Sequence, residues 1–360
     1  MTSVYTPPFK GLPVPQWWKG TLEDIDELLS QVTVGQVEQM GTSAGGLPIK
    51  RVSYGPVEPY HRTANSSSAS GARSLKYYAD KSTRTRPVIM IVGGIHAAEI
   101  EGIVAVNNLI RLLESGADGQ GQSWPEITRL AAQSRLVLVP CLNVDGRKRC
   151  LPESFVGESL ECLRRWNQGV AKDGTPLEWP DFKAVHPRSP QEEAFLGTGH
   201  NAAGVNLMHD DFFRPMAPET RALIDLVDQE APDFILLLHG AASAPFHFWG
   251  TYYVPERIRE LIMAFTQGVY ERFSRHGCDF YGRLPYSEHE VVPETMNLTS
   301  ALYHVCGGVS VLFESYQGVV RGDEAPRMTW DEILRYHMLL FEETLVFCQE
   351  QFQALIEPFC

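Results

Sequence analysis

A short apolar run that leads into a His-x-x-Glu pair constrains the fold of this 360-residue chain more than any other stretch. Residues 88–92 are all apolar, two glycines follow, and a helical pattern then continues to about residue 113. This order predicts a strand, a tight turn and a helix. His96 and Glu99 would then lie at the carboxyl end of the strand, where open α/β sheets commonly form their binding sites.

His96 and Glu99 could bind one cation together, because an imidazole and a carboxylate three residues apart can converge across such a turn. The alternative is a surface histidine beside a solvated glutamate, since a lone His-x-x-Glu pair often occurs by chance. Zinc is the leading interpretation, because the glycines leave space beside His96 and because two signals further along the chain fit the same site.

Two later strands are also predicted to end in groups that could act at a metal. The strand predicted from residue 233 is apolar over residues 234–238 and ends at His239, and the strand predicted from residue 308 ends at Glu314. A third ligand from a neighbouring strand would complete a set typical of zinc enzymes, and a carboxylate beside a metal-bound water could accept its proton. The alternatives are a hydrogen-bonded core histidine and an exposed glutamate at a strand terminus.

The remaining patterns predict a large α/β domain. Residues 135–146, an apolar run bounded by Pro140 and Asp145-Gly146, predict a second buried strand that ends in a turn and is parallel to the first. Residues 36–54 predict a hairpin around a glycine-rich turn. Capping residues and apolar periodicity predict several helices. Their expected ranges are 21–29, 217–229, 256–276, 298–306 and 330–355. We expect one domain over residues 1–360, with surface insertions near residues 56–86 and 147–199, the second an irregular loop near the site.

Net charge, apolar runs and cysteine pattern indicate which partners the protein can bind and in which compartment it works. A net charge of -13 argues against binding to nucleic acid or to an anionic membrane, because both need basic surfaces. No apolar run is long enough to span a membrane and no signal peptide is evident, so a cytoplasmic protein is expected. The seven cysteines form no C-x-x-C pair and are odd in number, which indicates reduced thiols.

Several motifs together resemble the zinc carboxypeptidase family (the carboxypeptidase A type) and the related succinylglutamate desuccinylase and aspartoacylase group. In chain order they are Gly-Thr-Ser-x-x-Gly-Leu-Pro-Ile at residues 41–49, His96-x-x-Glu99, Asn143-x-Asp-Gly, Gly204-Val-Asn-Leu, His239 and Phe313-Glu314. The resemblance implies a three-layer α/β/α fold with a mixed, mostly parallel central sheet. It also implies one Zn²⁺ per chain, bound by His96, Glu99 and His239, with Glu314 as the general base and Asn206 orienting His96 through its other ring nitrogen.

The family's substrate-binding arginines are missing from the matching positions. After Asn206 the family has an Asn-Arg pair whose arginine binds the substrate's terminal carboxylate, and this chain has Met208 and His209. Ala98 replaces a substrate-binding arginine in the metal motif, and His200 stands where an arginine would stabilise the oxyanion. One imidazole does not reproduce the bidentate contact of a guanidinium with a carboxylate. We therefore expect the metal and the base to be kept and substrate recognition to be atypical.

The resemblance implies a zinc metallohydrolase that cleaves an amide bond in a small peptide or an N-acyl amino acid by metal-activated water. Chain length and the amino-terminal hairpin favour a peptidase-like amidohydrolase over an N-acyl amino acid deacylase. A catalytically silent binding protein on the same fold is the alternative from another class. Ordinary peptides with a free carboxyl end should be poor substrates. The candidate substrate-binding residues are His200, His209, Arg214, Arg164, Arg165 and Tyr286.

Overall fold

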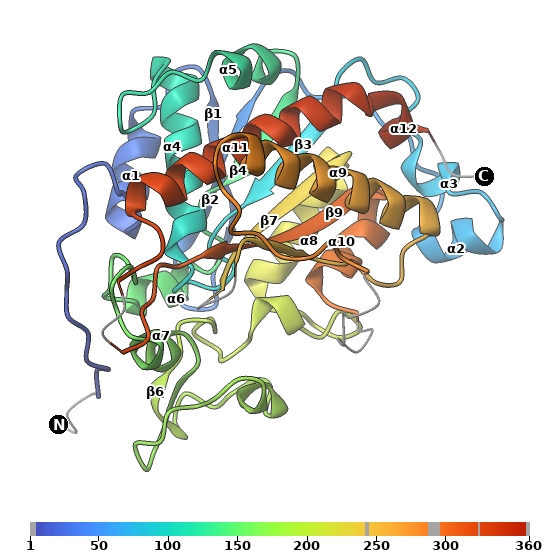
Figure 1. Cartoon of the computed structure of the whole chain (residues 1–360). Coiled ribbons are helices and arrows are strands. Elements are labelled where there is room, and N and C mark those ends of the chain that lie inside the picture. The colour runs from blue at the N-terminus through green and yellow to red at the C-terminus, as the bar shows by residue number, and fades with distance from the viewer. Residues whose placement is uncertain (1–4, 242–244, 287–295, 323–324, 358–360) are drawn as a thin grey trace.

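A seven-stranded sheet forms the centre of the protein (Figure 1). The structure, a computed structural model, describes residues 5–241, 245–286, 296–322 and 325–357. In spatial order the strands are β1 (Gln36–Thr42), β2 (Pro48–Tyr54), β4 (Arg135–Val139), β3 (Val88–Val92), β7 (Phe234–Ala241), β9 (Val309–Tyr316) and β8 (His247–Trp249). The central strands β4, β3, β7 and β9 are parallel, while β1, β2 and β8 run antiparallel to their neighbours. The predicted mixed sheet is confirmed.

Helices cover both faces of this sheet, which explains why the parallel strands are apolar along their whole length. The α11 helix contacts α4, α5 and α9, and α9 and α11 lie in front of the sheet in Figure 1. The α8 and α10 helices contact each other and form the opposite layer. Their bounds are α4 (Ile100–Ser115), α5 (Pro125–Ala131), α8 (Pro218–Glu230), α9 (Glu256–Arg275), α10 (Leu298–Cys306) and α11 (Trp330–Glu350).

The order of the strands creates a topological switch point between β3 and β7. From β3 the chain passes through α4 and α5 to β4 on one side, and it later returns through α8 to β7 on the other side. Open α/β sheets bind their ligands outside the carboxyl ends of the strands at such a point. This position lies beside the predicted His-x-x-Glu pair.

Close packing of glycines shapes the connection from β3 to α4. Gly94 has a positive φ of +60°, and a Cβ on Gly93 would lie 2.6 Å from the Pro140 carbonyl oxygen. In the first turn of α4, a Cβ on Gly102 would lie 2.8 Å from the Leu238 Cβ. The tight turn and the glycine contact therefore bring the start of α4 against β7.

Most of the predicted helices are confirmed within a few residues at their ends. The amino-terminal helix is α1 (Leu22–Ser30), and Thr21 caps it by accepting from the Asp24 amide. The predicted last helix is divided into α11 and the short α12 (Phe352–Ile356). The six cysteines in the described ranges are free and buried, and Cys360 lies outside those ranges. Within the same ranges, no helix combines the length and the apolar character of a membrane span.

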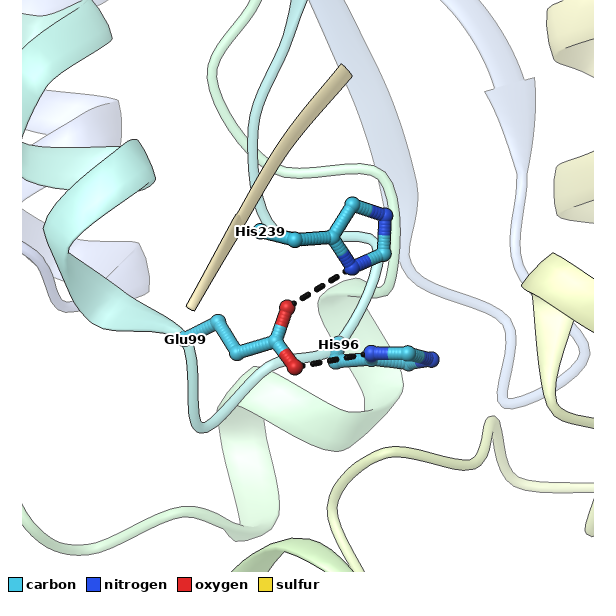
Figure 2. A group of neighbouring side chains, drawn as sticks. All are labelled: His96, Glu99 and His239. Carbon is cyan, nitrogen blue, oxygen red and sulfur yellow. Dashed lines mark hydrogen bonds and ion pairs between the residues drawn. The ribbon is translucent and has the colours of Figure 1, made fainter. Parts of the chain in front are cut away.

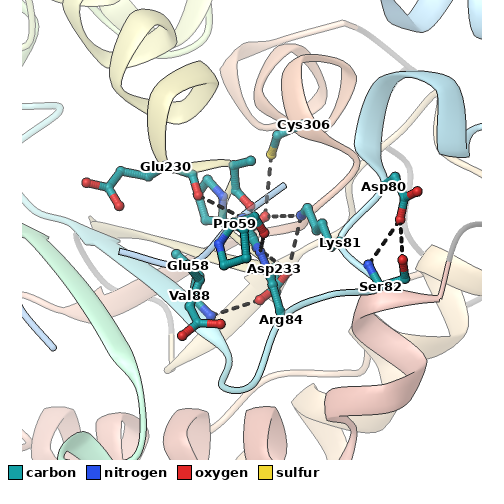
Figure 3. A network of polar contacts seen from close by, with 12 residues as sticks. Glu58, Pro59, Asp80, Lys81, Ser82, Arg84, Val88, Glu230, Asp233 and Cys306 are labelled. Carbon is teal, nitrogen blue, oxygen red and sulfur yellow. Dashed lines mark hydrogen bonds and ion pairs between the residues drawn. The ribbon is translucent and has the colours of Figure 1, made fainter. Parts of the chain in front are cut away.

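Residues 56–86 include two short helices that the sequence did not predict, α2 (Ser66–Gly71) and α3 (Lys76–Ala79). This segment is tied to the start of β7 by buried charges (Figure 3). Arg84 donates to Asp233 Oδ1 at 2.7 Å, and Lys81 Nζ lies 3.3 Å from the same oxygen. Asp233 Oδ2 accepts from the Val88 amide at 2.8 Å, so one carboxylate joins this segment to the first residue of β3.

Residues 147–199 form a second segment, which lies at the lower edge of Figure 1 in green. Where an irregular loop was expected, it contains regular elements. These are the end of α6 (Val144–Arg149), then α7 (Leu160–Asn167), β5 (Gly169–Ala171), the 3-10 helix η1 (Asp181–Ala184) and β6 (Glu193–Leu196), with β5 and β6 paired antiparallel. The Ala97 amide donates to the Thr198 carbonyl at 3.3 Å, so this segment returns to the turn after β3.

Candidate metal centre

Three predicted side chains meet at the switch point (Figure 2). His96 follows β3, Glu99 is the residue before α4, and His239 lies in β7. The Glu99 carboxylate lies between the two imidazoles: Oε1 is 2.8 Å from His96 Nδ1, and Oε2 is 2.8 Å from His239 Nδ1. One candidate ligand atom from each residue lies within 4.8 Å of the others.

These three side chains are largely shielded from water. The exposed fractions are 14% for His96, 6% for Glu99 and 2% for His239. Burial alone would raise the pKa of Glu99, but the two imidazoles lower it below its usual value. Burial alone would likewise lower the pKa of His96, and the Glu99 carboxylate raises it instead. The site therefore favours a carboxylate anion together with positive charge beside it.

Asn206 orients the His96 ring through its Nε2 atom, so that the Nδ1 atom faces Glu99. His96 Nε2 lies 3.0 Å from Asn206 Oδ1, and this oxygen also accepts from the Met208 amide at 3.1 Å. Because Oδ1 acts as an acceptor, Nε2 carries a hydrogen, and in the neutral form of the ring the Nδ1 lone pair would face the Glu99 carboxylate. A lone pair and a carboxylate at that distance need a proton or a cation between them. Two imidazoles and one carboxylate are a donor set that suits zinc.

The position of Asn206 is itself supported by a residue of the 147–199 segment. Asn206 precedes the 3-10 helix η2 (Leu207–His209), and its backbone N–H donates to His186 Nε2 at 2.9 Å. Burial lowers the pKa of His186, which favours the neutral ring that can accept this bond. Sequence analysis did not select His186, because no local pattern links it to Asn206.

Glu314 lies on the strand next to His239. The register of the parallel pair β7 and β9 places Glu314 directly opposite His239, and paired residues of adjacent strands point to the same face of a sheet. Glu314 Oε1 accepts from the indole of Trp249 at 3.1 Å. Both strands continue two residues beyond the predicted ends, since pairing extends to Ala241 and Tyr316.

A cavity of about 250 Å³ lies beside the metal-ligand cluster. Asn206 lines it and also contacts His96, which places the cavity next to the first candidate ligand. The other lining residues are Phe182, Lys183, Val185, His186, His200 and His209. Two predicted substrate-binding residues, His200 and His209, therefore face the same space.

The four other candidate substrate-binding residues do not line this cavity. Arg214 is 81% exposed and lies 3.5 Å from an oxygen of Asp211, and Arg164 lies 3.7 Å from an oxygen of Glu178. Arg165 pairs with Glu161 at 2.8 Å in the same helix. Tyr286 is held to the backbone of Thr251, donating to its carbonyl at 2.8 Å and accepting from its amide at 2.7 Å. Each of these side chains is thus engaged elsewhere.

Comparison with known proteins agrees with this architecture. Three solved structures have a similar fold: a metallo-carboxypeptidase from Burkholderia cenocepacia, carboxypeptidase A from Helicoverpa armigera, and bovine thrombin-activatable fibrinolysis inhibitor in complex with tick carboxypeptidase inhibitor. The first is 15% identical, with a TM-score of 0.57 over 91% of this chain and 69% of its own. The second is 14% identical, with a TM-score of 0.56 over 94% and 74% of the two chains. The third is 10% identical, with a TM-score of 0.57 over 94% and 100%.

Sequence comparison identifies the family directly. No curated protein matches the chain. The model of the zinc carboxypeptidase family, however, matches residues 22–311, which include the His-x-x-Glu pair, Asn206 and His239. This match covers well over half of the chain, and the similar folds are those of metallo-carboxypeptidases. The chain belongs to the zinc carboxypeptidase family.

Proposed function

We propose that this protein is a zinc-dependent hydrolase that cleaves an amide bond in a small peptide or an N-acyl amino acid. His96, Glu99 and His239 would hold one Zn²⁺, and Glu314 would act as the general base. The observation that carries the proposal is the convergence of the three ligand atoms within 4.8 Å, with Glu314 opposite His239 in the sheet. When bound at such a site, zinc polarises a carbonyl and lowers the pKa of a water molecule.

The residues of the chain would divide the remaining work. Glu99 supplies the negative charge that attracts the cation, and Asn206 holds His96 with its Nδ1 nitrogen directed at the site. Glu314 would accept a proton from the attacking water and pass it to the leaving amine. Its Oε1 atom already accepts from Trp249, which restrains the carboxylate and leaves Oε2 for proton transfer.

The test of this proposal is a metal analysis of the purified protein combined with a substrate screen. The protein is prepared without chelator, its zinc content is measured, and N-acyl amino acids and short peptides with free or amidated carboxyl ends are assayed for amide cleavage. We expect about one zinc per chain and zinc-dependent cleavage of at least one of these classes.

Two results would contradict the proposal in different ways. Less than about a tenth of an equivalent of zinc would rule out a tightly held metal. Full zinc occupancy without cleavage of any amide in the screen would instead favour a binding protein that has kept the fold and the metal.

A further inference from the structure

Lys183 brings a positive charge close to the candidate metal centre, and the proposed function gives this charge no role. Lys183 belongs to η1, in the 147–199 segment, and lines the cavity beside the metal-ligand cluster. Its ammonium group contacts His209 Nε2 at 3.0 Å and remains accessible to solvent. In the part of the chain that the structure describes, it forms no ion pair with a carboxylate.

Several contacts fix this part of the segment against the loop that carries Asn206 and His209. The Arg188 amide donates to the Gly204 carbonyl at 2.9 Å, and the Asn206 amide donates to His186 Nε2 at 2.9 Å. The Phe182 ring also packs edge-on against the His200 ring, with centroids 6.0 Å apart. Lys183 is therefore held at the cavity wall by its neighbours on both sides in sequence.

Among the described residues that line this cavity, Lys183 is the one whose side chain is positively charged near pH 7. The three histidines that line it have lowered pKa values, mainly because burial disfavours their charged forms. The values for His200 and His209 are both about 3, so both rings are neutral near pH 7. A neutral His209 can accept the hydrogen bond from Lys183 and thereby orient the ammonium group. The cavity thus offers one cation in a setting of neutral imidazoles and apolar side chains.

The ammonium group is also close enough to the metal centre to interact with its carboxylates. Partial burial lowers the pKa of Lys183, while attraction to Glu314 and Glu99 opposes that shift. Both carboxylates have other tasks under the proposed function, since Glu99 would bind the metal and Glu314 would accept a proton. The charge of Lys183 therefore remains for a ligand that enters the cavity.

We infer that Lys183, oriented by His209, determines substrate specificity by binding one carboxylate group of the substrate next to the bond that is cleaved. This inference rests on the proposed function, which identifies the cleaved bond as an amide. It differs from the expectation from the sequence, which was a substrate with no charge at this place or with a group met by His209, Arg214 or the Arg164-Arg165 pair. An ammonium group acts as a point charge, so it imposes a looser geometry than the paired bonds of a guanidinium.

The test compares two probes that differ in one charge, N-acetyl-L-leucine and N-acetyl-L-leucinamide. Their binding to the zinc-loaded protein is measured by calorimetry for the wild type, Lys183→Met and Lys183→Arg. We expect the wild type to prefer the free acid by about tenfold or more, which is typical of a hydrogen bond to a charged group. Lys183→Met should abolish this preference without weakening the binding of N-acetyl-L-leucinamide. Lys183→Arg should retain much of the preference.

Lys172→Met is the matched control, because Lys172 is an exposed lysine of the same segment that does not line the cavity. It should leave the preference unchanged. A preference that survives in Lys183→Met would show that the acid is bound elsewhere, for example by the metal. Equal binding of the two probes to the wild type, or no binding of the acid, would also overturn the inference.

This experiment separates the inference from the proposed function, because it measures binding without turnover. A preference that depends on Lys183 in a protein that cleaves no amide would disprove only the hydrolase. Amide cleavage with a preference that is independent of Lys183 would disprove only the role of the lysine.

Discussion

His239 and Glu314 occupy paired positions on adjacent parallel strands, β7 and β9. The hydrogen-bonded ladder of the sheet, and not a contact between the two side chains, fixes their relative position. The flanking pairs in the same register are Leu238 with Phe313 and Gly240 with Ser315. A conservative change of either side chain should therefore leave the backbone of the site in place, which makes these positions suitable for testing separate roles.

Glu314→Gln should lower turnover by about a hundredfold or more while zinc content and folding stay unchanged. Glutamine keeps the shape and the hydrogen-bonding capacity towards Trp249 but cannot accept the proton. Turnover of the substrate found in the screen, zinc content and the circular dichroism spectrum are the measurements. Activity within a few-fold of wild type would show that another residue is the base.

His239→Ala should reduce the zinc content of the purified protein from about one equivalent to less than about a tenth. The change removes one of the three ligand atoms, and Nδ1 of His239 is the atom that faces Glu99. His247→Ala is the control, since His247 lies on β8 and directs its Nδ1 at the Pro245 carbonyl. Equal zinc content in the two variants would mean that the metal is bound elsewhere.

Asn206→Ala should weaken zinc binding by about ten- to a hundredfold, because His96 loses the acceptor that fixes its ring. Asn206→Asp keeps an oxygen at the same place and should retain most of the affinity. Competition with a chelator of known affinity measures both. If the alanine variant bound zinc as tightly as the wild type, the contact would have no role in orienting the ligand.

Asp233→Ala should destabilise the fold by about 3–5 kcal/mol, because it leaves the buried charges of Arg84 and Lys81 without their carboxylate. Asp225→Ala is the matched control, since Asp225 pairs with Arg221 on the exposed face of α8. An exposed pair of this kind contributes about 0.3–0.5 kcal/mol. Urea unfolding of both variants provides the comparison, and similar losses would contradict the assigned importance of Asp233.

His337 should make the protein less stable as the pH falls from about 6.5 to 4. Burial lowers the pKa of His337 to about 4, and its Nε2 atom has no hydrogen-bond partner among the described residues. Between these pH values the unfolded chain binds a proton that the folded chain excludes, so acid favours unfolding by at most about 1.4 kcal/mol per pH unit.

His337→Leu should show a weaker fall in stability over the same range, because it removes the titrating group. Unfolding by urea at pH 7.5, 6, 5 and 4.5 measures the slope. Identical slopes for the variant and the wild type would show that other groups account for the acid sensitivity.

Local sequence patterns were enough to predict the elements that carry the metal-ligand cluster. The run before His96 is apolar and ends in glycines, and the runs before His239 and Glu314 are long enough to mark buried strands. The positions of β7 and β9 as neighbours, in this register, come from pairing between distant segments. Their exact ends were therefore predicted two residues too early.

Patterns that depend on tertiary contacts were missed. The strand β8 has only three residues and is defined by its pairing with β9, so no periodicity reveals it. Lys183 reaches the cavity because η1 packs on the loop around His209. No local sequence pattern links these two residues, which are 26 positions apart. Arg164, Arg165 and Arg214 were predicted from their charge alone, and in the structure each of them lies near a surface carboxylate.

The two ends of β7 are held in different ways. Just before the strand begins, Asp233 has both carboxylate oxygens bonded to Arg84, Lys81 and the Val88 amide (Figure 3). Near its other end, His239 Nε2 has no hydrogen-bond partner among the described residues. The strand is thus secured at the end remote from the proposed chemistry. Removing zinc with a chelator should therefore disturb only the side chains near His239 and leave the fold intact. The metal-free protein should then bind zinc again without having to refold.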